Sequence, residues 1–138
     1  MRAGFAFRTD LRVRFSEIDG QSVVFNSRYL EYADVAIAEY WRAAGVDLID
    51  THVVKAGVQY LRPLRYDDTV AMYVRTDRIG TSSLTTTIEM CRGDGDEAHA
   101  SVELVHVLVD LTTGRPVPIG EDTRARLAAL DGRATPRP

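Results

Sequence analysis

The segment SEIDGQSVVFNSRYLEYADVAIAEYW, residues 16–41, decides the fold because it changes from a loop into a long helix. From Ser27 onward, apolar residues recur at the spacing of one helix face: Tyr29, Leu30, Ala33, Ala36, Ile37, Tyr40, Trp41 and Ala44. Gly45 follows directly and is a typical residue at a helix end. Because this apolar stripe is broad, the helix must be covered along its length by other elements.

Strand-like segments lie on both sides of this helix. Before it, Leu11, Val13 and Phe15 alternate with arginines, which predicts a half-buried strand. After it come four strand-like runs, HVVKAGVQYL (52–61), TVAMYVRT (69–76), SLTTTIEMCR (83–92) and SVELVHVLVD (101–110). The last run is almost continuously apolar, which predicts a central strand covered on both faces, and GDGD at 93–96 predicts a hairpin turn.

One long helix and five strands predict an α+β fold, a curved antiparallel five-stranded sheet wrapped around the helix. Residues 1–138 form a single domain, with a short helix at 121–130 and a flexible tail at 131–138. One sheet face and one strand edge stay uncovered in this arrangement, so we expect a homodimer or homotetramer.

Composition excludes several classes of function. The 138 residues carry a formal net charge of −3, so neither nucleic acid nor an anionic membrane is an expected partner. The single cysteine, Cys91, excludes an intrachain disulfide and indicates a reducing compartment. No apolar run predicts a signal peptide or a membrane span, so the expected location is the cytoplasm.

The histidines and acidic residues have no spacing typical of a metal site, so no metal is expected. We expect His52 and His99 at the surface. His106 shares a face with Val102, Leu104 and Leu108, which predicts a hydrogen-bonded core histidine.

Asp19 lies in the loop before the long helix and has two interpretations. It can be a turn residue, with Asn26 or Ser27 as the helix N-cap. Alternatively, the free N–H groups at the helix start stabilise an oxyanion while Asp19 activates water or attacks directly. Spacing alone favours the first interpretation.

The segment DGQSVVFNSRYLEYAD, residues 19–34, resembles the signature loop and helix of the hotdog-fold acyl-CoA thioesterases, the hydroxybenzoyl-CoA thioesterase-like group. The similarity continues through VQYLRPLRYDD (58–68), RTDRIGTSSL (75–84) and VHVLVDLTTGRPVPI (105–119). The resemblance implies hydrolysis of an acyl-CoA thioester to acid and thiol, with the active site at a dimer interface. Coenzyme A enters as part of the substrate, and no other cofactor is implied.

The resemblance also implies roles for particular residues. Asp19 matches the catalytic nucleophile or general base, Asn26 the position whose backbone N–H faces the thioester carbonyl, and Asp34 an acidic position that supports the site or is solvated on the helix flank. Implied substrate contacts, which are alternatively core or surface residues, are Ser22, Val24, Phe25, Tyr29 and Tyr60 near the acyl group and Arg78, Gly80 and Ser82 near coenzyme A. Arg62 and Arg65 are further candidates for its phosphates.

Two residues depart from the family pattern. Ser22 replaces a glycine, and Asn26 stands where many relatives have histidine. These departures leave open a hotdog protein that binds acyl-CoA or an acyl carrier without turnover. A hydratase or dehydratase is a third hypothesis, which lacks a matching acid–histidine pair beside the helix. The sequence specifies neither the acyl group nor the choice between coenzyme A and carrier-protein thioesters.

Overall fold

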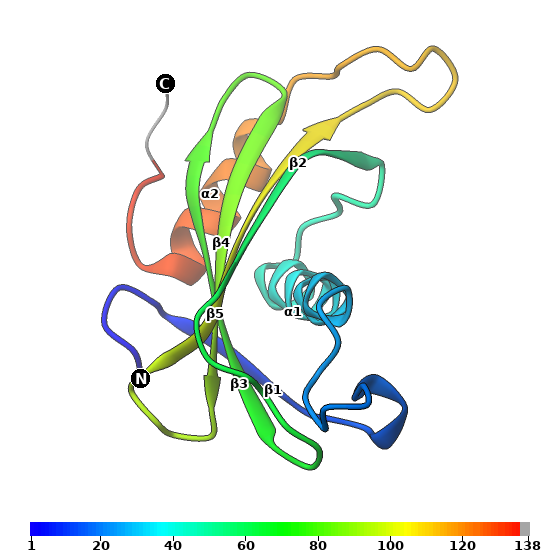
Figure 1. Cartoon of the computed structure of the whole chain (residues 1–138). Helices are drawn as coiled ribbons and strands as arrows, with labels where there is room; N and C mark the ends of the chain where they lie inside the picture. The colour runs from blue at the N-terminus through cyan, green and yellow to red at the C-terminus, as the bar shows by residue number, and fades with distance from the viewer. Residues whose placement is uncertain (136–138) are drawn as a thin grey trace.

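The computed structural model describes residues 1–135 and has one curved sheet and two α-helices (Figure 1). The elements are β1 (Phe7–Arg12), the 3₁₀ turn η1 (Phe15–Glu17), α1 (Arg28–Ala44), β2 (Thr51–Tyr60), β3 (Thr69–Ile79), β4 (Ser83–Arg92), β5 (Ala98–Leu108) and α2 (Glu121–Asp131). The strand order is β1-β3-β4-β5-β2, with every neighbouring pair antiparallel. The sheet curves around α1, as the sequence predicts.

Helix α1 positions the core because its apolar stripe faces the sheet. Its buried residues are Tyr29, Tyr32, Ala33, Ala36, Ile37 and Tyr40. Gly45 ends the helix in the left-handed conformation at φ 74°, which glycine adopts without steric cost. The predicted helix bounds are therefore confirmed.

The two faces of the sheet are buried to different extents. β5 lies inside the sheet, but Val102 and Leu104 on it are buried while Glu103 between them is exposed. The prediction that this strand is covered on both faces is therefore wrong. β3 is the strand that is covered on both faces, because Phe5 in the N-terminal segment packs with Tyr73 on the face opposite α1.

One of the two edge strands differs from the sequence-based expectation. β1 ends at Arg12, and Phe15 lies in η1 with 73% of its surface exposed, so the predicted strand through Phe15 is wrong. β2, at the other edge, pairs only with β5, and all its residues except Thr51 and Val58 are exposed. This long exposed edge is unusual for a stable monomer.

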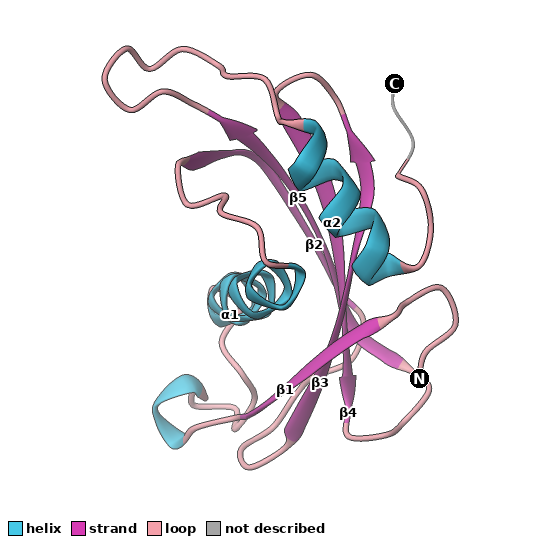
Figure 2. Ribbon diagram, turned by 180° about the vertical axis from the view of Figure 1, so that it is seen from behind, coloured by secondary structure: helices cyan, strands magenta, loops and turns pink. Residues whose placement is uncertain are grey.

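The C-terminal helix closes the core at the end of the sheet where β3 turns into β4 (Figure 2). Leu127 is buried there, and the Arg124 side chain donates to the carbonyl oxygens of Ile79 and Gly80. The sequence places Asp131 in a flexible tail, but it ends α2, and its carboxylate accepts hydrogen bonds from the Tyr40 hydroxyl at 2.8 Å and the Thr76 amide at 3.0 Å. The tail prediction is therefore wrong at Asp131, and residues 136–138 lie outside the described range.

Neither helix among residues 1–135 has the length and apolarity needed to cross a lipid bilayer.

Candidate active site at the start of helix α1

A buried carboxylate holds the loop that precedes α1. Glu17 is 5% exposed, and its Oε1 accepts hydrogen bonds from the Arg14 amide at 2.7 Å and the Tyr32 hydroxyl at 2.9 Å. Its Oε2 accepts from the Arg14 guanidinium at 2.9 Å. Burial opposes ionisation of Glu17, but the hydrogen bonds from Arg14 and Tyr32 outweigh it and hold the pKa below its usual value. Because Tyr32 belongs to α1, this contact fixes the loop to the helix.

Asp19 lies at the tip of this loop. Its amide donates to the Val23 carbonyl at 2.9 Å, and its Oδ1 accepts the Gln21 amide at 2.8 Å. A carboxylate that bonds the amide two residues ahead forms an Asx turn, so Asp19 is a turn residue. This bond uses Oδ1 and leaves Oδ2 free for other contacts, so the turn does not exclude a chemical role.

Ser22 has an unusual backbone conformation for a residue with a side chain. Its φ is 65°, in the left-handed region where a Cβ atom is unfavourable. This conformation closes the turn, since the Ser22 amide donates to the Asp19 carbonyl at 3.0 Å. This left-handed φ is the physical reason why glycine suits this position.

The start of α1 exposes backbone donors. Ser27 is the N-cap residue, but its side chain makes no capping hydrogen bond. Within residues 1–135, the amides of Asn26 and Ser27 have no acceptor. The Asn26 carbonyl accepts a hydrogen bond from the Tyr60 hydroxyl at 3.1 Å, which ties the helix start to the end of β2. Ser27 is therefore the N-cap residue, as one interpretation predicted, but without a capping side-chain bond, and the free amides form a potential oxyanion site.

A small cavity of about 200 Å³ lies beside these amides, between the loop, α1 and the segment after β2. It is lined by Val23, Val24, Asn26, Tyr29, Tyr60, Leu61, Arg62 and Pro63. The structure thus gathers four predicted site residues, Val24, Asn26, Tyr29 and Tyr60. The rings of Tyr29 and Tyr60 meet edge to face at 5.1 Å. Phe25 lies outside this lining, with 52% of its surface exposed.

Other predicted site residues lie elsewhere in the chain. Asp34 is eight residues along α1 from Asn26, about 12 Å at the helical rise per residue. Arg78, Gly80 and Ser82 lie where β3 turns into β4, and the rise along β3 puts Arg78 roughly 30 Å from the strand's start near the loop. One chain therefore does not bring these four residues to the small cavity.

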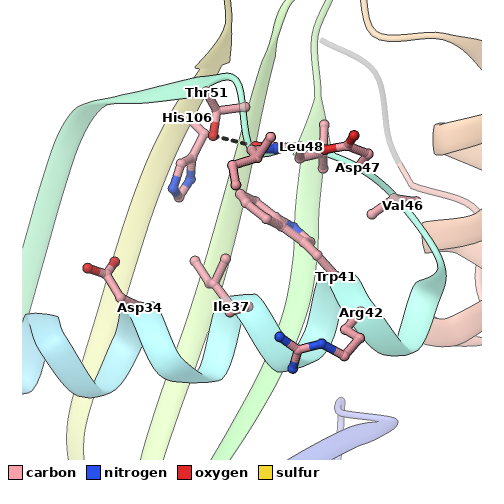
Figure 3. A pocket seen from close by; sticks show the side chains of 11 residues that line it. Asp34, Ile37, Trp41, Arg42, Val46, Asp47, Leu48, Thr51 and His106 are labelled. Carbon is pink, nitrogen blue, oxygen red and sulfur yellow. Dashed lines mark hydrogen bonds between the residues drawn. The ribbon is translucent and has the colours of Figure 1, made fainter.

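A larger cavity, of about 760 Å³, lies near the start of β2, alongside the middle and last turns of α1 (Figure 3). Asp34, Ile37 and Trp41 from α1, Leu48 from the following loop and His106 from β5 line it. Burial and the nearby Glu31 raise the pKa of Asp34. Sequence spacing did not predict that Asp34 and His106 face one cavity.

The histidines depart from two predictions. His99 is only 9% exposed, so its predicted surface position is wrong, whereas His52 is exposed as predicted. His106 is buried as predicted, but it lacks the expected hydrogen bond, and its Nδ1 is buried without a partner. Among the described residues, no group of three or more His, Cys, Asp or Glu side chains could hold a metal ion.

Comparison with known proteins assigns the family. Residues 13–127 match the model of the Thioesterase-like superfamily, and the chain belongs to that superfamily. A thioesterase from Thermus thermophilus, solved with coenzyme A and Zn, is 33% identical, with a TM-score of 0.85 over 95% of this chain and 98% of that one. The PA5185 protein from Pseudomonas aeruginosa strain PAO1 is 28% identical, with a TM-score of 0.84 over 94% of each chain.

A 1,4-dihydroxy-2-naphthoyl-CoA thioesterase from Synechocystis shares the fold at 16% identity, with a TM-score of 0.82 over 91% of this chain and 97% of that one. These similarities confirm the predicted hotdog fold and thioesterase family. The superfamily match and the similarity to the Thermus thermophilus thioesterase support thioester hydrolysis as the general activity of this chain.

Proposed function

We propose that the chain hydrolyses an acyl-CoA thioester at the start of α1. The observation that carries this proposal is the pair of free amides at Asn26 and Ser27, beside a small cavity and a loop that holds Asp19. The positive end of the helix and the N–H groups favour negative charge at this point. A thioester carbonyl oxygen bound there gains stabilisation as it becomes an oxyanion.

Asp19 has the role of general base in this reaction. Its carboxylate takes a proton from water while the water oxygen attacks the thioester carbonyl carbon. The resulting oxyanion accepts hydrogen bonds from the Asn26 amide. The carbon–sulfur bond then breaks, the thiolate takes the proton from Asp19, and the products are a free acid and a thiol. A direct attack by Asp19, through an acyl anhydride that water then hydrolyses, uses the same residues.

The active form in this proposal is a homodimer joined along β2. Tyr60, at one end of β2, contacts the helix start, while Thr51, at the other end, lines the larger cavity. If two copies pair antiparallel along this exposed edge, a two-fold axis brings the Tyr60 end of one chain beside the Thr51 end of the other. The small cavity of each chain then adjoins the larger cavity of its partner, where Asp34 lies.

The same pairing brings the turn between β3 and β4 toward the partner's helix start. Within residues 1–135, Arg78 is exposed and forms no ion pair, which makes it available for a phosphate of coenzyme A. Arg62 is less available, since its side chain pairs with Glu97 at 3.1 Å.

The test is a thiol-release assay over aromatic, short-chain and long-chain acyl-CoAs, with the wild-type protein and Asp19→Asn. Hydrolysis of at least one acyl-CoA that depends on Asp19 is the expected result. Ligand-dependent thermal stabilisation without thiol release would instead favour an acyl-CoA-binding protein that does not turn over its ligand. The strained Ser22 and the absence of a histidine at position 26 are the features that make this second function worth testing.

A further inference from the structure

The larger cavity has apolar walls but an unpaired polar group at its inner side. Ile37 and Trp41 on α1 and Leu48 in the following loop supply apolar surface, and the His106 ring meets the Trp41 ring edge to face at 5.1 Å. Figure 3 shows the His106 ring pointing from β5 toward α1, into the space between Asp34 and Trp41. The side chain therefore points from the sheet toward α1, and its ring forms part of the cavity wall.

The unpaired state of His106 is energetically unfavourable. The side chain is 5% exposed, and its Nδ1 is buried without a hydrogen-bond partner among the described residues. A buried polar group without a partner costs about 1–3 kcal/mol, so such groups are normally satisfied by protein, water or ligand. Burial also lowers the pKa of His106, so the ring is neutral and can both donate and accept a hydrogen bond.

Trp41 adds a second unpaired group to the same wall. The indole Nε1 is buried and has no acceptor within residues 1–135, although it can only donate. The cavity volume of about 760 Å³ lies within the range of small-molecule sites, and few polar groups in an apolar lining are typical of such sites. A wholly apolar ligand would leave both nitrogens unpaired, whereas one oxygen atom can pair with His106.

We propose that this cavity binds the far end of the acyl group and selects acyl groups that carry a terminal hydroxyl, which hydrogen-bonds to His106. The inference rests on the proposed function, because it assigns a substrate class to the same reaction. The acyl chain lies against Ile37, Trp41 and Leu48, and the hydroxyl group donates to or accepts from the His106 ring. In the homodimer along β2, the thioester carbonyl lies at the partner's helix start, beside this cavity.

The activity test compares hexanoyl-CoA with its terminally hydroxylated analogue, ω-hydroxyhexanoyl-CoA. One additional net hydrogen bond is worth about 1–1.5 kcal/mol, so we expect kcat/KM to be about tenfold higher for the hydroxylated substrate. His106→Phe keeps an aromatic ring of similar size and should reduce this ratio to about one. Tyr73→Phe is the control, because Tyr73 lies on the sheet face opposite α1, outside both the cavity and β2, and it should keep the tenfold ratio.

A second measurement decides the inference without turnover. Trp41 is the only tryptophan of the chain and lines the cavity, so its fluorescence reports ligands bound there. Titration with ω-hydroxyhexanoate should change this fluorescence at about tenfold lower concentration than titration with hexanoate, and His106→Phe should remove the difference.

Equal affinity of the two acids for the wild-type protein, or no response to either, would overturn the inference even if hexanoyl-CoA is hydrolysed. Conversely, preferential binding of the hydroxy acid without any thiol release would keep the cavity assignment and refute the proposed hydrolysis. A preference that survives in His106→Phe would also overturn the inference.

Discussion

Glu17 is the residue whose substitution best tests how the loop before α1 is held. Glu17→Gln keeps the size of the side chain but removes the charge that strengthens its hydrogen bonds. Two of its donors, the Arg14 amide at 2.7 Å and the Tyr32 hydroxyl at 2.9 Å, meet Oε1 in a buried environment. A hydrogen bond to a charged group contributes about 1.5–3 kcal/mol and one between neutral groups about 1 kcal/mol. The two differences together predict a loss of about 2 kcal/mol in the free energy of unfolding.

The loss should depend on pH in a defined direction. The folded protein holds the pKa of Glu17 below its unfolded value of about 4.3, mainly because hydrogen bonds outweigh burial. The stabilisation is therefore present above that unfolded value and disappears as the pH falls through the lower folded value. The wild-type protein and Glu17→Gln should differ most near neutral pH and converge in acid.

Urea unfolding followed by circular dichroism at neutral pH and at several acidic values measures both effects. Glu39→Gln is the matched control, since Glu39 forms an exposed ion pair with Arg42 on α1 and should lose about 0.5 kcal/mol or less. The reasoning is refuted if Glu17→Gln unfolds like the control, or if its deficit is the same at neutral and acidic pH. Because Glu17 fixes the loop that carries Asp19, thiol release should also decrease in Glu17→Gln.

Three further substitutions test separate parts of the structure. Ser22→Gly relieves the left-handed conformation and should raise the free energy of unfolding by about 1 kcal/mol, whereas Ser22→Ala keeps the strain and should not. Tyr40→Phe removes the buried hydroxyl that bonds Thr76 Oγ1 and Asp131 Oδ1, both at 2.8 Å, and should lower the free energy of unfolding by about 2 kcal/mol. An unchanged urea midpoint would contradict the buried network. Ala56→Glu puts like charges on the β2 strands of both chains at the proposed interface, so light scattering should detect monomers. Ala125→Glu, on the exposed surface of α2, should leave dimers, and dimers in both variants would contradict an interface along β2.

The periodic parts of the fold were predictable from the sequence because their patterns are local. The extent of α1 and its stop at Gly45 were predicted correctly, as was the hairpin turn at 93–96. The predicted stripe was wrong at Leu30, which is exposed, and it left out Tyr32, which is buried. The burial of β5 on both faces was not, because an apolar run does not show whether a second layer covers the strand. Its outward residues Val105 and Val107 are only partly buried.

The candidate site was predictable only in part, because its contacts join residues far apart in the chain. Asp19, Asn26 and Tyr29 could be proposed from one short segment. In the sequence, Glu17 resembles any acidic residue of a loop, and only the fold shows that the Tyr32 hydroxyl donates a hydrogen bond to it. The cavity that His106 faces depends on the register between β5 and β2, which local sequence patterns do not specify.

The most direct test of the proposed reaction compares Asp19→Asn with Asp110→Asn in the thiol-release assay. The two aspartates form the same local turn, since Asp110 Oδ1 accepts the Thr112 amide and Asp19 Oδ1 the Gln21 amide, each at 2.8 Å. Asparagine can keep that bond in both variants, so only the chemistry differs. General base catalysis is typically worth about 10²–10⁴-fold, so Asp19→Asn should lose at least about a hundredfold in kcat while Asp110→Asn keeps the wild-type rate. A rate near wild type in folded Asp19→Asn would contradict the role of Asp19 in catalysis.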